Sequence, residues 1–417
     1  MINYEITKLD NGITVISEML PYVKTFSLGF FFDVGSRDED ESNNGISHFI
    51  EHMLFKGTEK RSAKKLSDEI ESTGGYLNAF TSKEHTCYYG RGLAKNLTKT
   101  FSVLSDMIQY STFKKNEIDK EAGVIIDELY DIEDSPEELI FDTFETNIFK
   151  GNRVAMPIIG TEANINKFNR EMILNYIDAN YGFDNLYIVA SGFVEHKKLI
   201  ALTEKYITKD MGVRKSSREI VKINPAQDQL ISKEIQQTHM ILGNTTYGYQ
   251  DYKNRIAVNV LSQILGEGSS SRLFQRLREK NGIAYQINTF LNSFYDISTF
   301  GAYISTNDKS FSKAQKLIFD EFKKIKSKKV SEQELKRAKE YLKGSILMSM
   351  ESTSNRMIRM AQSYIYFGKI HSTDESVAII DEVSSEQVLE LANMLLEEKE
   401  LNKVIISSGN LSMQSAA

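Results

Sequence analysis

The chain repeats itself, and this internal repeat constrains the fold more than any other feature of its 417 residues. Three segments of the first half align with segments of the second: HMLFKG (52–57) with LSQILG (261–266), NEIDKEAGVIIDE (116–128) with QELKRAKEYLKGS (333–345), and YIVASG (187–192) with VIISSG (404–409). The first shift is 261 − 52 = 209 positions and the second is 333 − 116 = 217. A period this long is the size of a domain, far beyond the roughly 20–50 residues of a solenoid repeat. The sequence therefore predicts two halves built alike.

The boundary between the halves is predicted from composition. A chain of 417 residues exceeds what one hydrophobic core usually holds. The stretch KDMGVRKSSREIVK (209–222) is the most polar and least periodic part of the sequence. We therefore expect a first domain over residues 1–210, a linker over about 211–222, and a related second domain over residues 223–417.

Hydrophobic periodicity gives a coarse order of elements for the first half. Segments rich in β-branched and aromatic residues predict strands, and segments with a 3.6-residue period predict helices, the first two of which are ended by glycine. The predicted strands are 12–18, 25–36, the pair YLNAFTS and HTCYYGRG, and 185–194, and the predicted helices include 45–56, 62–72, 94–110, 114–132 and 136–149. Strands and helices mixed in this way indicate an α+β protein.

Composition excludes several classes of partner. The net charge of -6 and the pI near 5.7 argue against a nucleic-acid binder, which would show a basic surface. No segment approaches the roughly 18 apolar residues that span a bilayer, and the N-terminal sequence lacks the features of a secretory signal. The single cysteine, Cys87, suits a reducing compartment. We expect a cytoplasmic protein with no membrane or nucleic-acid partner.

The segment His48-Phe49-Ile50-Glu51-His52 carries the clearest chemistry. On a helix over 45–56, His48 and His52 are i and i+4, so their rings project from one face, as two imidazoles must to share a tetrahedral zinc ion. Glu51 shares that face without having to be a ligand. Its carboxylate is therefore a candidate general base for a water that attacks a carbonyl beside the ion.

A catalytic zinc site usually needs a third protein ligand. Glu121 and Glu128 lie seven residues apart on the predicted helix 114–132, and hence on one face of it. Either carboxylate could complete a two-histidine, one-glutamate set on helical geometry alone. The other would orient an imidazole or the water.

The candidate residues occur only in the first copy of the repeat. Their counterparts in the second half are apolar or small: Ala257, Val260 and Leu261 for the motif, and Ala338 and Ser345 for the two glutamates. The halves thus share a pattern of elements but not a chemistry. We expect a single metal site, in the first half, and a different role for the second half.

These residues give the chain a resemblance to a known family. His48-x-x-Glu51-His52 is the HxxEH motif of the M16 (pitrilysin) metallopeptidases, and the chain resembles the bacterial branch similar to the β subunit of the mitochondrial processing peptidase. In that family the third ligand is a glutamate 76 residues beyond the second histidine, which selects Glu128 (128 − 52 = 76), and Glu121 matches an assisting acidic residue. The resemblance implies the LuxS/MPP-like metallohydrolase fold, with two related α+β domains, each a mainly antiparallel sheet covered by helices on one side.

The resemblance extends to two further sites. GGYLNAFTSKEHTCYY (74–89) matches the strand that binds substrate by adding the peptide to its edge, with Asn78 and Ala79 in the contacting segment. LREKNGIAY (277–285) matches an Arg/Tyr pair that polarises the scissile carbonyl, which gives Arg278 and Tyr285. In two-chain members of the family the facing subunit presents this pair. A homodimer, or a heterodimer with a related subunit, is therefore expected.

The sequence as a whole predicts a metalloendopeptidase with one zinc ion per chain. Its expected substrates are unfolded peptides or precursor segments, hydrolysed inside a dimeric chamber. General peptide degradation and specific processing are not separated by the sequence. An alternative is a non-catalytic scaffold or chaperone-like subunit, because some relatives in the family have lost the metal site. The complete set of four residues here argues against that alternative.

Overall fold

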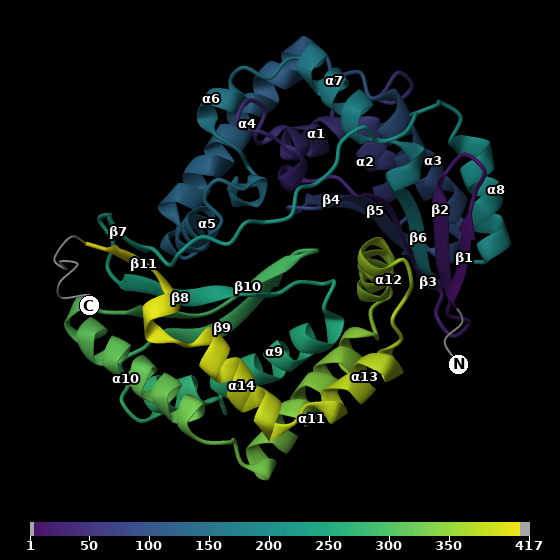
Figure 1. Cartoon of the computed structure of the whole chain (residues 1–417). Helices are drawn as coiled ribbons and strands as arrows, with labels where there is room; N and C mark the ends of the chain where they lie inside the picture. Colours follow the sequence, from purple (N-terminus) through teal and green to yellow (C-terminus); the bar gives the residue numbers. More distant parts are fainter. Residues whose placement is uncertain (1–3, 409–417) are drawn as a thin grey trace. The chain divides into compact units, whose positions relative to one another are not determined.

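The computed structural model describes residues 4–408 and divides the chain into two compact units. Within that range, unit 1 comprises residues 4–130, 156–219 and 349–371, and unit 2 comprises residues 131–155, 220–348 and 372–408. Both units combine a β-sheet with helices, so the predicted α+β class is confirmed (Figure 1). Gly409, the last residue of the predicted repeat segment 404–409, lies outside the described residues.

The sheet of unit 1 has the strand order β1-β2-β6-β3-β5-β4. Its strands are β1 (Tyr4–Lys8), β2 (Thr14–Met19), β3 (Thr25–Phe32), β4 (Tyr76–Thr81), β5 (Thr86–Leu93) and β6 (Leu186–Gly192). Neighbouring strands are antiparallel except β2 and β6, which pair in parallel. The helices of this unit are α1 (Ile46–Leu54), α2 (Ala63–Glu71), α3 (Leu97–Tyr110), most of α4 (Lys115–Asp134), α6 (Glu162–Ile165), α7 (Arg170–Asn180), α8 (His196–Tyr206) and α12 (Thr353–Phe367).

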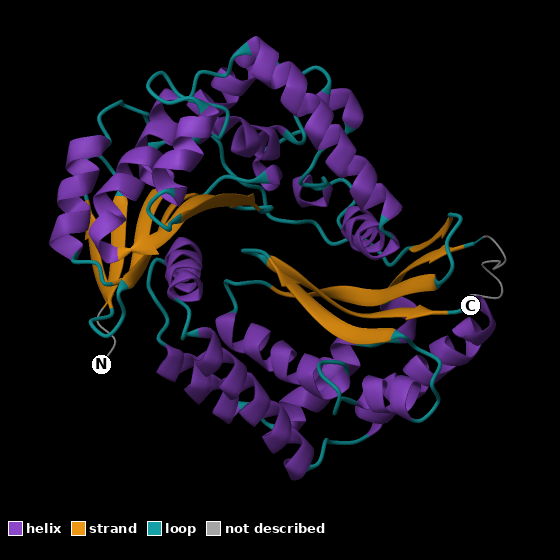
Figure 2. Cartoon of the chain, turned by 180° about the vertical axis from the view of Figure 1, so that it is seen from behind, coloured by secondary structure: helices purple, strands orange, loops and turns teal. Residues whose placement is uncertain are grey.

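Unit 2 repeats this plan with a sheet in the order β7-β11-β8-β10-β9. Its strands are β7 (Asp228–Ser232), β8 (Thr238–Tyr247), β9 (Gln286–Ser293), β10 (Ile297–Thr306) and β11 (Asn402–Ser407), with β7 and β11 parallel and the other neighbours antiparallel. Its helices are α5 (Pro136–Ile148), α9 (Tyr252–Leu265), a π-helix (Phe274–Glu279), α10 (Asp308–Ser327), α11 (Glu332–Ser349), α13 (Thr373–Glu382) and α14 (Ser385–Leu395). Figure 2 shows helices on the faces of both sheets.

Each sheet is covered on one face by helices from its own half of the chain and on the other face by a helix from the other half. In β3, Phe30 packs its ring on Phe101 of α3, with centroids 5.1 Å apart, whereas the next residue, Phe31, lies in a buried cluster with Met357 and Met360 of α12. Successive residues of a strand point to opposite faces, so α3 and α12 cover opposite sides of the sheet. The expectation of helices on one side only is therefore wrong.

Unit 2 has the same arrangement with the halves exchanged. In β8, Leu242 packs into the cluster formed with α9, α10 and α14, while the adjacent Ile241 packs with Ile140 and Phe144 of α5. Helix α5 comes from the first half of the chain, and α12 comes from the second. The shift of 217 residues places α12 at the repeat position of α5, because 136 + 217 = 353. The two copies thus exchange equivalent helices.

This exchange makes the compact units discontinuous in sequence. The change of unit between Glu219 and Ile220 lies within the predicted linker. The predicted ranges 1–210 and 223–417 assign α5 to the first domain and α12 to the second, whereas each helix packs in the other compact unit. As domain boundaries these ranges stay a prediction.

The linker has no helix or strand, but ion pairs hold it on unit 1. The guanidinium groups of Arg214 and Arg218 both contact the carboxylates of Asp33 and Asp38, with Arg218 Nη1 2.6 Å from Asp33 Oδ1 and Nη2 2.7 Å from Asp38 Oδ2. The Arg218 side chain is 15% exposed, and its pKa is raised, although partial burial opposes this, because the carboxylates of Asp38 and Asp33 lie beside it. The linker therefore fixes the loop that precedes α1.

Among residues 4–408, no helix combines the length and apolar character that crossing a bilayer requires.

Helix α12 is held by a buried ion pair whose loss should destabilise the protein. Arg356 Nη1 lies 2.5 Å from Glu18 Oε1 on β2, and Glu18 is 1% exposed. We expect Arg356→Met to lower the free energy of unfolding by about 3 kcal/mol, because it leaves a buried carboxylate without its cation. Urea unfolding followed by circular dichroism measures this.

The matched control is Lys64→Met, which removes an exposed ion pair with Asp68 and should leave the free energy of unfolding close to that of the wild type. The double variant Glu18→Gln/Arg356→Met should recover part of the loss. Equal stability of Arg356→Met and the wild type would contradict the structural role given to this pair.

Candidate metal centre

Helix α1, which carries the HxxEH motif, is buried along one side. Phe49, Ile50 and Met53 are buried in the core of unit 1, which fixes the rotation of the helix. The opposite side carries His48 and His52, whose side chains are 12% and 22% exposed. Their ring centroids lie 4.6 Å apart, one turn from each other along the helix. The predicted i, i+4 arrangement is thus present in the structure.

The N-terminus of α1 is bound by a buried carboxylate that was not among the predicted residues. Glu39 Oε1 accepts from Ser47 N at 2.8 Å, and Oε2 accepts from Gly45 N at 2.7 Å and from Asn44 Nδ2 at 2.9 Å. Burial raises the pKa of Glu39 to about 7, although these hydrogen bonds lower it. Glu39 satisfies N–H groups that a helix start leaves without partners and so holds the helix that carries the motif.

Glu128 of α4 meets the two imidazoles. Its Oε1 lies 3.9 Å from His48 Nε2 and its Oε2 lies 3.6 Å from His52 Nε2. One donor atom from each of the three residues lies within 4.8 Å of the other two. This is the two-nitrogen, one-oxygen donor set that catalytic zinc sites use. The structure brings Glu128, rather than Glu121, into this group.

The environment of His48 suits a neutral ligand. Burial, with a smaller contribution from His52, lowers the pKa of His48 to about 4. The imidazole is therefore uncharged near neutral pH, and a lone pair is available for a metal ion. Its other nitrogen, Nδ1, is buried and has no hydrogen-bond partner among residues 4–408. Of the two histidine rings, only that of His52 is thus oriented by a hydrogen bond in the part of the chain that the structure describes.

Glu121 and Lys56 form a chain of contacts behind His52. Glu121 Oε1 lies 2.9 Å from His52 Nδ1, and Glu121 Oε2 lies 2.6 Å from Lys56 Nζ. Burial alone would raise the pKa of Glu121, but hydrogen bonds from His52 and Lys56 hold it below its ordinary value. The ionised carboxylate keeps the proton of His52 on Nδ1 and leaves Nε2 free to face Glu128. Lys56 lies four residues after His52, in the turn that follows the end of α1 at Leu54.

Glu51 is held by a threonine of the edge strand. Thr81 Oγ1 on β4 donates to Glu51 Oε2 at 2.5 Å. Burial raises the pKa of Glu51, with a further increase from Glu128, while Thr81 and His52 lower it. A raised carboxylate pKa brings the group closer to neutral pH, where a general base works best. Thr81 was not predicted, although it lies on the same face of the strand as Ala79.

The edge strand has backbone groups available for pairing. β4 is the last strand of its sheet and pairs only with β5 among the described strands. Ser82 N donates to His85 O at 2.9 Å, which closes the hairpin with a hydrogen-bonded pair. Because such pairs alternate along an antiparallel ladder, the N–H and C=O groups of Leu77, Ala79 and Thr81 point away from β5. Asn78 instead bonds to β5 through its backbone and exposes its side chain.

Arg278 and Tyr285 lie together on the surface of unit 2. Arg278 Nη1 donates to the carbonyl oxygen of Tyr285 at 3.0 Å, and its guanidinium lies 5.9 Å from the centre of the Tyr285 ring and 5.1 Å from that of Phe274. Arg278 is exposed, and Tyr285 is 68% exposed. The pair that the sequence predicts is thus assembled within its own unit.

The second-half counterparts of the motif are part of a core. Ala257, Val260 and Leu261 on α9 are all 1% exposed or less, and they belong to the main cluster of unit 2. Ala338 on α11 is also buried there. These positions pack the second unit and offer no ligand.

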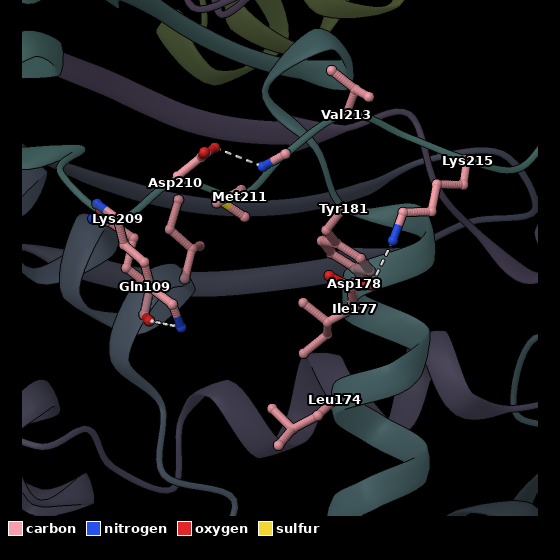
Figure 3. Close-up of a pocket in the computed structure, with 12 residues that line it drawn as sticks. Gln109, Leu174, Ile177, Asp178, Tyr181, Lys209, Asp210, Met211, Val213 and Lys215 are labelled. Atoms are coloured by element: carbon pink, nitrogen blue, oxygen red, sulfur yellow. Dashed lines mark hydrogen bonds and ion pairs between the residues drawn. The ribbon is translucent and has the colours of Figure 1, made fainter.

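Two cavities of unit 1 lie outside the metal group. One, of about 590 Å³, is lined by the end of α3, by α7 and by residues 209–215, with an ion pair of 2.6 Å between Lys215 and Asp178 at its rim (Figure 3). The other, of about 450 Å³, lies between the loop at 38–43 and α7. Neither contains a member of the metal group or Glu51.

The side chains present fit a zinc ion. Two Nε2 atoms and a carboxylate face one another, one imidazole is held neutral, the other is oriented by a carboxylate, and a second carboxylate, Glu51, stands beside them. A fold of two related α+β units with this group defines the class of zinc metallohydrolases that use an inverted HxxEH motif.

Comparison with known families agrees with that class. Residues 14–162 match the family described as insulinase (peptidase family M16), and residues 167–342 match the peptidase M16 inactive domain. The chain belongs to the M16 peptidase family.

Relatives and solved structures extend over nearly the whole chain. An uncharacterized zinc protease of Rickettsia felis is 34% identical over 397 residues, covering 94% of this chain and 95% of that one. The uncharacterized zinc protease YmxG of Bacillus subtilis is 32% identical over 409 residues, with 96% and 98% covered. In fold, the chain is similar to a protease from Helicobacter pylori, with a TM-score of 0.91, 22% identity, and 97% and 99% coverage. A Pseudomonas fluorescens structure described as a peptidase M16 inactive domain gives a TM-score of 0.90 at 18% identity, with 97% and 98% covered.

Lys56 offers a test of the contacts behind His52. We expect Lys56→Met to weaken zinc binding, because Glu121 loses the cation that keeps it ionised. The loss should lie below the roughly 10- to 100-fold expected for Glu121→Ala, which removes the partner of the ligand itself. Competition with a chromogenic chelator measures the affinity.

Lys56→Arg should restore most of the affinity because it restores the charge. Lys115→Met, at an exposed lysine of α4, is the matched control and should bind zinc like the wild type. Wild-type affinity in Lys56→Met would show that Glu121 acts without it.

Proposed function

We propose that the chain is a zinc-dependent endopeptidase that hydrolyses extended peptides, either unfolded chains or precursor segments. The observation that carries the proposal is the position of Glu51, which lies next to His52 on α1 with its carboxylate held by Thr81 at 2.5 Å. The family and the names of the relatives support a zinc peptidase. A complete set of ligands and base supports an enzyme over a non-catalytic scaffold.

The proposed roles divide between holding the ion and moving a proton. His48, His52 and Glu128 would hold one zinc ion per chain. When bound, zinc would supply Lewis-acid chemistry that polarises a carbonyl and makes water more acidic. Glu51 would accept the proton of the attacking water on its carboxylate and deliver it to the leaving amine. Thr81 holds one oxygen of Glu51, which leaves the other free to accept that proton.

Substrate would bind by adding a strand to β4. The free N–H and C=O groups of Leu77, Ala79 and Thr81 supply backbone hydrogen bonds, which are independent of side chains and therefore accept varied sequences. Thr81 ends this row and also contacts Glu51, so a peptide docked on the strand lies beside the base. Asn78 would contribute its exposed side chain.

The second half would contribute Arg278 and Tyr285. Their exposed guanidinium and phenol groups are donors suited to a developing oxyanion. We propose that they act across a homodimer, or a heterodimer with a related subunit, in which two chains enclose the substrate. The single cysteine supports a cytoplasmic location.

The first test separates metal binding from proton transfer. We expect Glu51→Gln to retain about one zinc per chain but to lose roughly 10²- to 10⁴-fold in peptide hydrolysis, because the amide cannot accept the proton. Atomic absorption and hydrolysis of a quenched fluorescent peptide measure the two quantities.

Asp119→Asn, at an exposed residue on the same helix as Glu128, is the control and should keep both properties. Full activity in Glu51→Gln would refute the role of Glu51. Absence of zinc and of any peptide hydrolysis in the wild type would refute the enzyme itself.

A mixing experiment tests whether Arg278 acts across subunits. We expect Glu51→Gln and Arg278→Ala chains to be weakly active alone and to regain about half of the wild-type activity as purified mixed dimers, because one of the two composite sites is then intact. Two affinity tags isolate the mixed species. A mixed dimer no more active than its parents would indicate that each chain uses its own arginine.

A further inference from the structure

Aromatic side chains form a row along one face of the hairpin made by β4 and β5. The ring centroids of Tyr76 and Tyr89 are 6.3 Å apart, those of Tyr89 and Phe80 are 6.3 Å apart, and those of Phe80 and His85 are 5.9 Å apart. Tyr89 lies directly opposite Asn78 in the hairpin, between the two flanking positions 76 and 80. These four residues, Tyr76, Phe80, His85 and Tyr89, are called the aromatic row.

The outer end of this row, Tyr76, lies outside the core. Tyr76 is 49% exposed, and Tyr89 and Phe80 are only partly buried at the margin of the cluster that α12 forms with the sheet. Asn78 Nδ2 donates to the hydroxyl of Tyr76 at 2.7 Å, which holds the ring in place while leaving it accessible. The exposed ring of Tyr76 and the partly exposed rings of Phe80 and Tyr89 thus offer apolar surface next to the strand edge where a peptide would pair.

The register of β4 relates this surface to a docked peptide. Leu77, Ala79 and Thr81 direct their backbone groups outward, and their side chains lie on the face of the sheet where Thr81 meets Glu51. Tyr76, Asn78 and Phe80 point to the opposite face. An added strand lies about 4.8 Å away and alternates its side chains in the same way. Every second side chain of the peptide therefore stands beside the aromatic row.

We propose that the aromatic row selects peptides with aromatic or aliphatic side chains at every second position, on the face turned away from Glu51. This inference rests on the proposed function, since it assumes that substrate adds to β4. Neighbouring aromatic and apolar side chains on adjacent strands attract each other through buried area and ring contacts. The intervening side chains face α1 and the metal group, and they do not contact the row.

The selection should be modest and periodic. One cross-strand pair with an aromatic residue corresponds to about a 3- to 10-fold preference over a small polar side chain. Because several such positions line the strand, the preference should recur at alternate positions around the cleaved bond. A preference at adjacent positions would not fit a strand.

Cleavage-site mapping tests the proposal. A mixture of random-sequence peptides is digested with wild-type, Tyr76→Ser and Tyr76→Phe chains, and cleavage sites are aligned by mass spectrometry. We expect alternating enrichment of apolar residues in the wild type, loss of about 3- to 10-fold enrichment at one of these positions in Tyr76→Ser, and retention in Tyr76→Phe, which keeps the ring. Tyr22→Ser, at a 73% exposed tyrosine in the turn after β2, is the matched control.

A binding arm separates this inference from the enzyme activity. Zinc-loaded Glu51→Gln chains, with and without Tyr76→Ser, are titrated with two fluorescent peptides, one alternating valine and serine and one of serine and glycine alone. Weaker binding of the alternating peptide to the Tyr76→Ser chains supports the proposal even if no peptide is cleaved, an outcome that would refute the proposed function. Cleavage without an alternating preference, or equal binding of both peptides, would refute selection by the aromatic row. Neither result would contradict the proposed peptidase activity.

Discussion

Burial of the second face of each sheet is the constraint on which the rest of the structure depends. A sheet that packs helices on one face still leaves an apolar surface on the other, as Phe31 on β3 and Ile241 on β8 demonstrate. The chain covers both surfaces by exchanging equivalent helices, α12 for one unit and α5 for the other. Close approach is needed at both places: a side chain added at Gly29 would come within 3.1 Å of Met357, and one at Gly243 within 2.8 Å of Phe144. The sheet of the unit that carries the metal group is therefore covered on both faces only when the second half of the chain is present.

The sequence predicted which side chains form the metal group, but not which residues hold those side chains in position. The i, i+4 spacing of the histidines and the loss of the motif from the second copy were sufficient to place a single metal group on α1. Helical geometry could not decide whether Glu121 or Glu128 is the third ligand, since both lie on one face of α4. The structure distinguishes them, because Glu121 faces Nδ1 of His52 and Glu128 faces Nε2. Glu39 carried no local signal, because its link to α1 passes through an irregular loop. The helix exchange was also not predicted, because the amphipathic pattern of α5 or α12 shows that a face is buried but not which sheet buries it.

One short strand serves several purposes in this arrangement. The outward backbone of β4 is available for peptide pairing, the hydroxyl of Thr81 holds Glu51, and the opposite face carries the aromatic row. The proposed peptide pairing, the support of the proposed base Glu51 and the proposed side-chain selection thus all depend on one register of β4. A shift of β4 by a single residue would reverse its two faces and would remove all of these contacts together. The hairpin closed by Ser82 and His85 fixes the strand against such a shift.

The burial of the second-half counterparts has an evolutionary consequence. Ala257, Val260 and Leu261 now fill the interior of their unit, whereas His48 and His52 keep part of their surface open. Returning imidazoles or a carboxylate to those interior positions would place polar groups among apolar neighbours and would overfill a packed core. A metal group could therefore be built in the second unit only by several substitutions made together, each of which would destabilise its core when made alone.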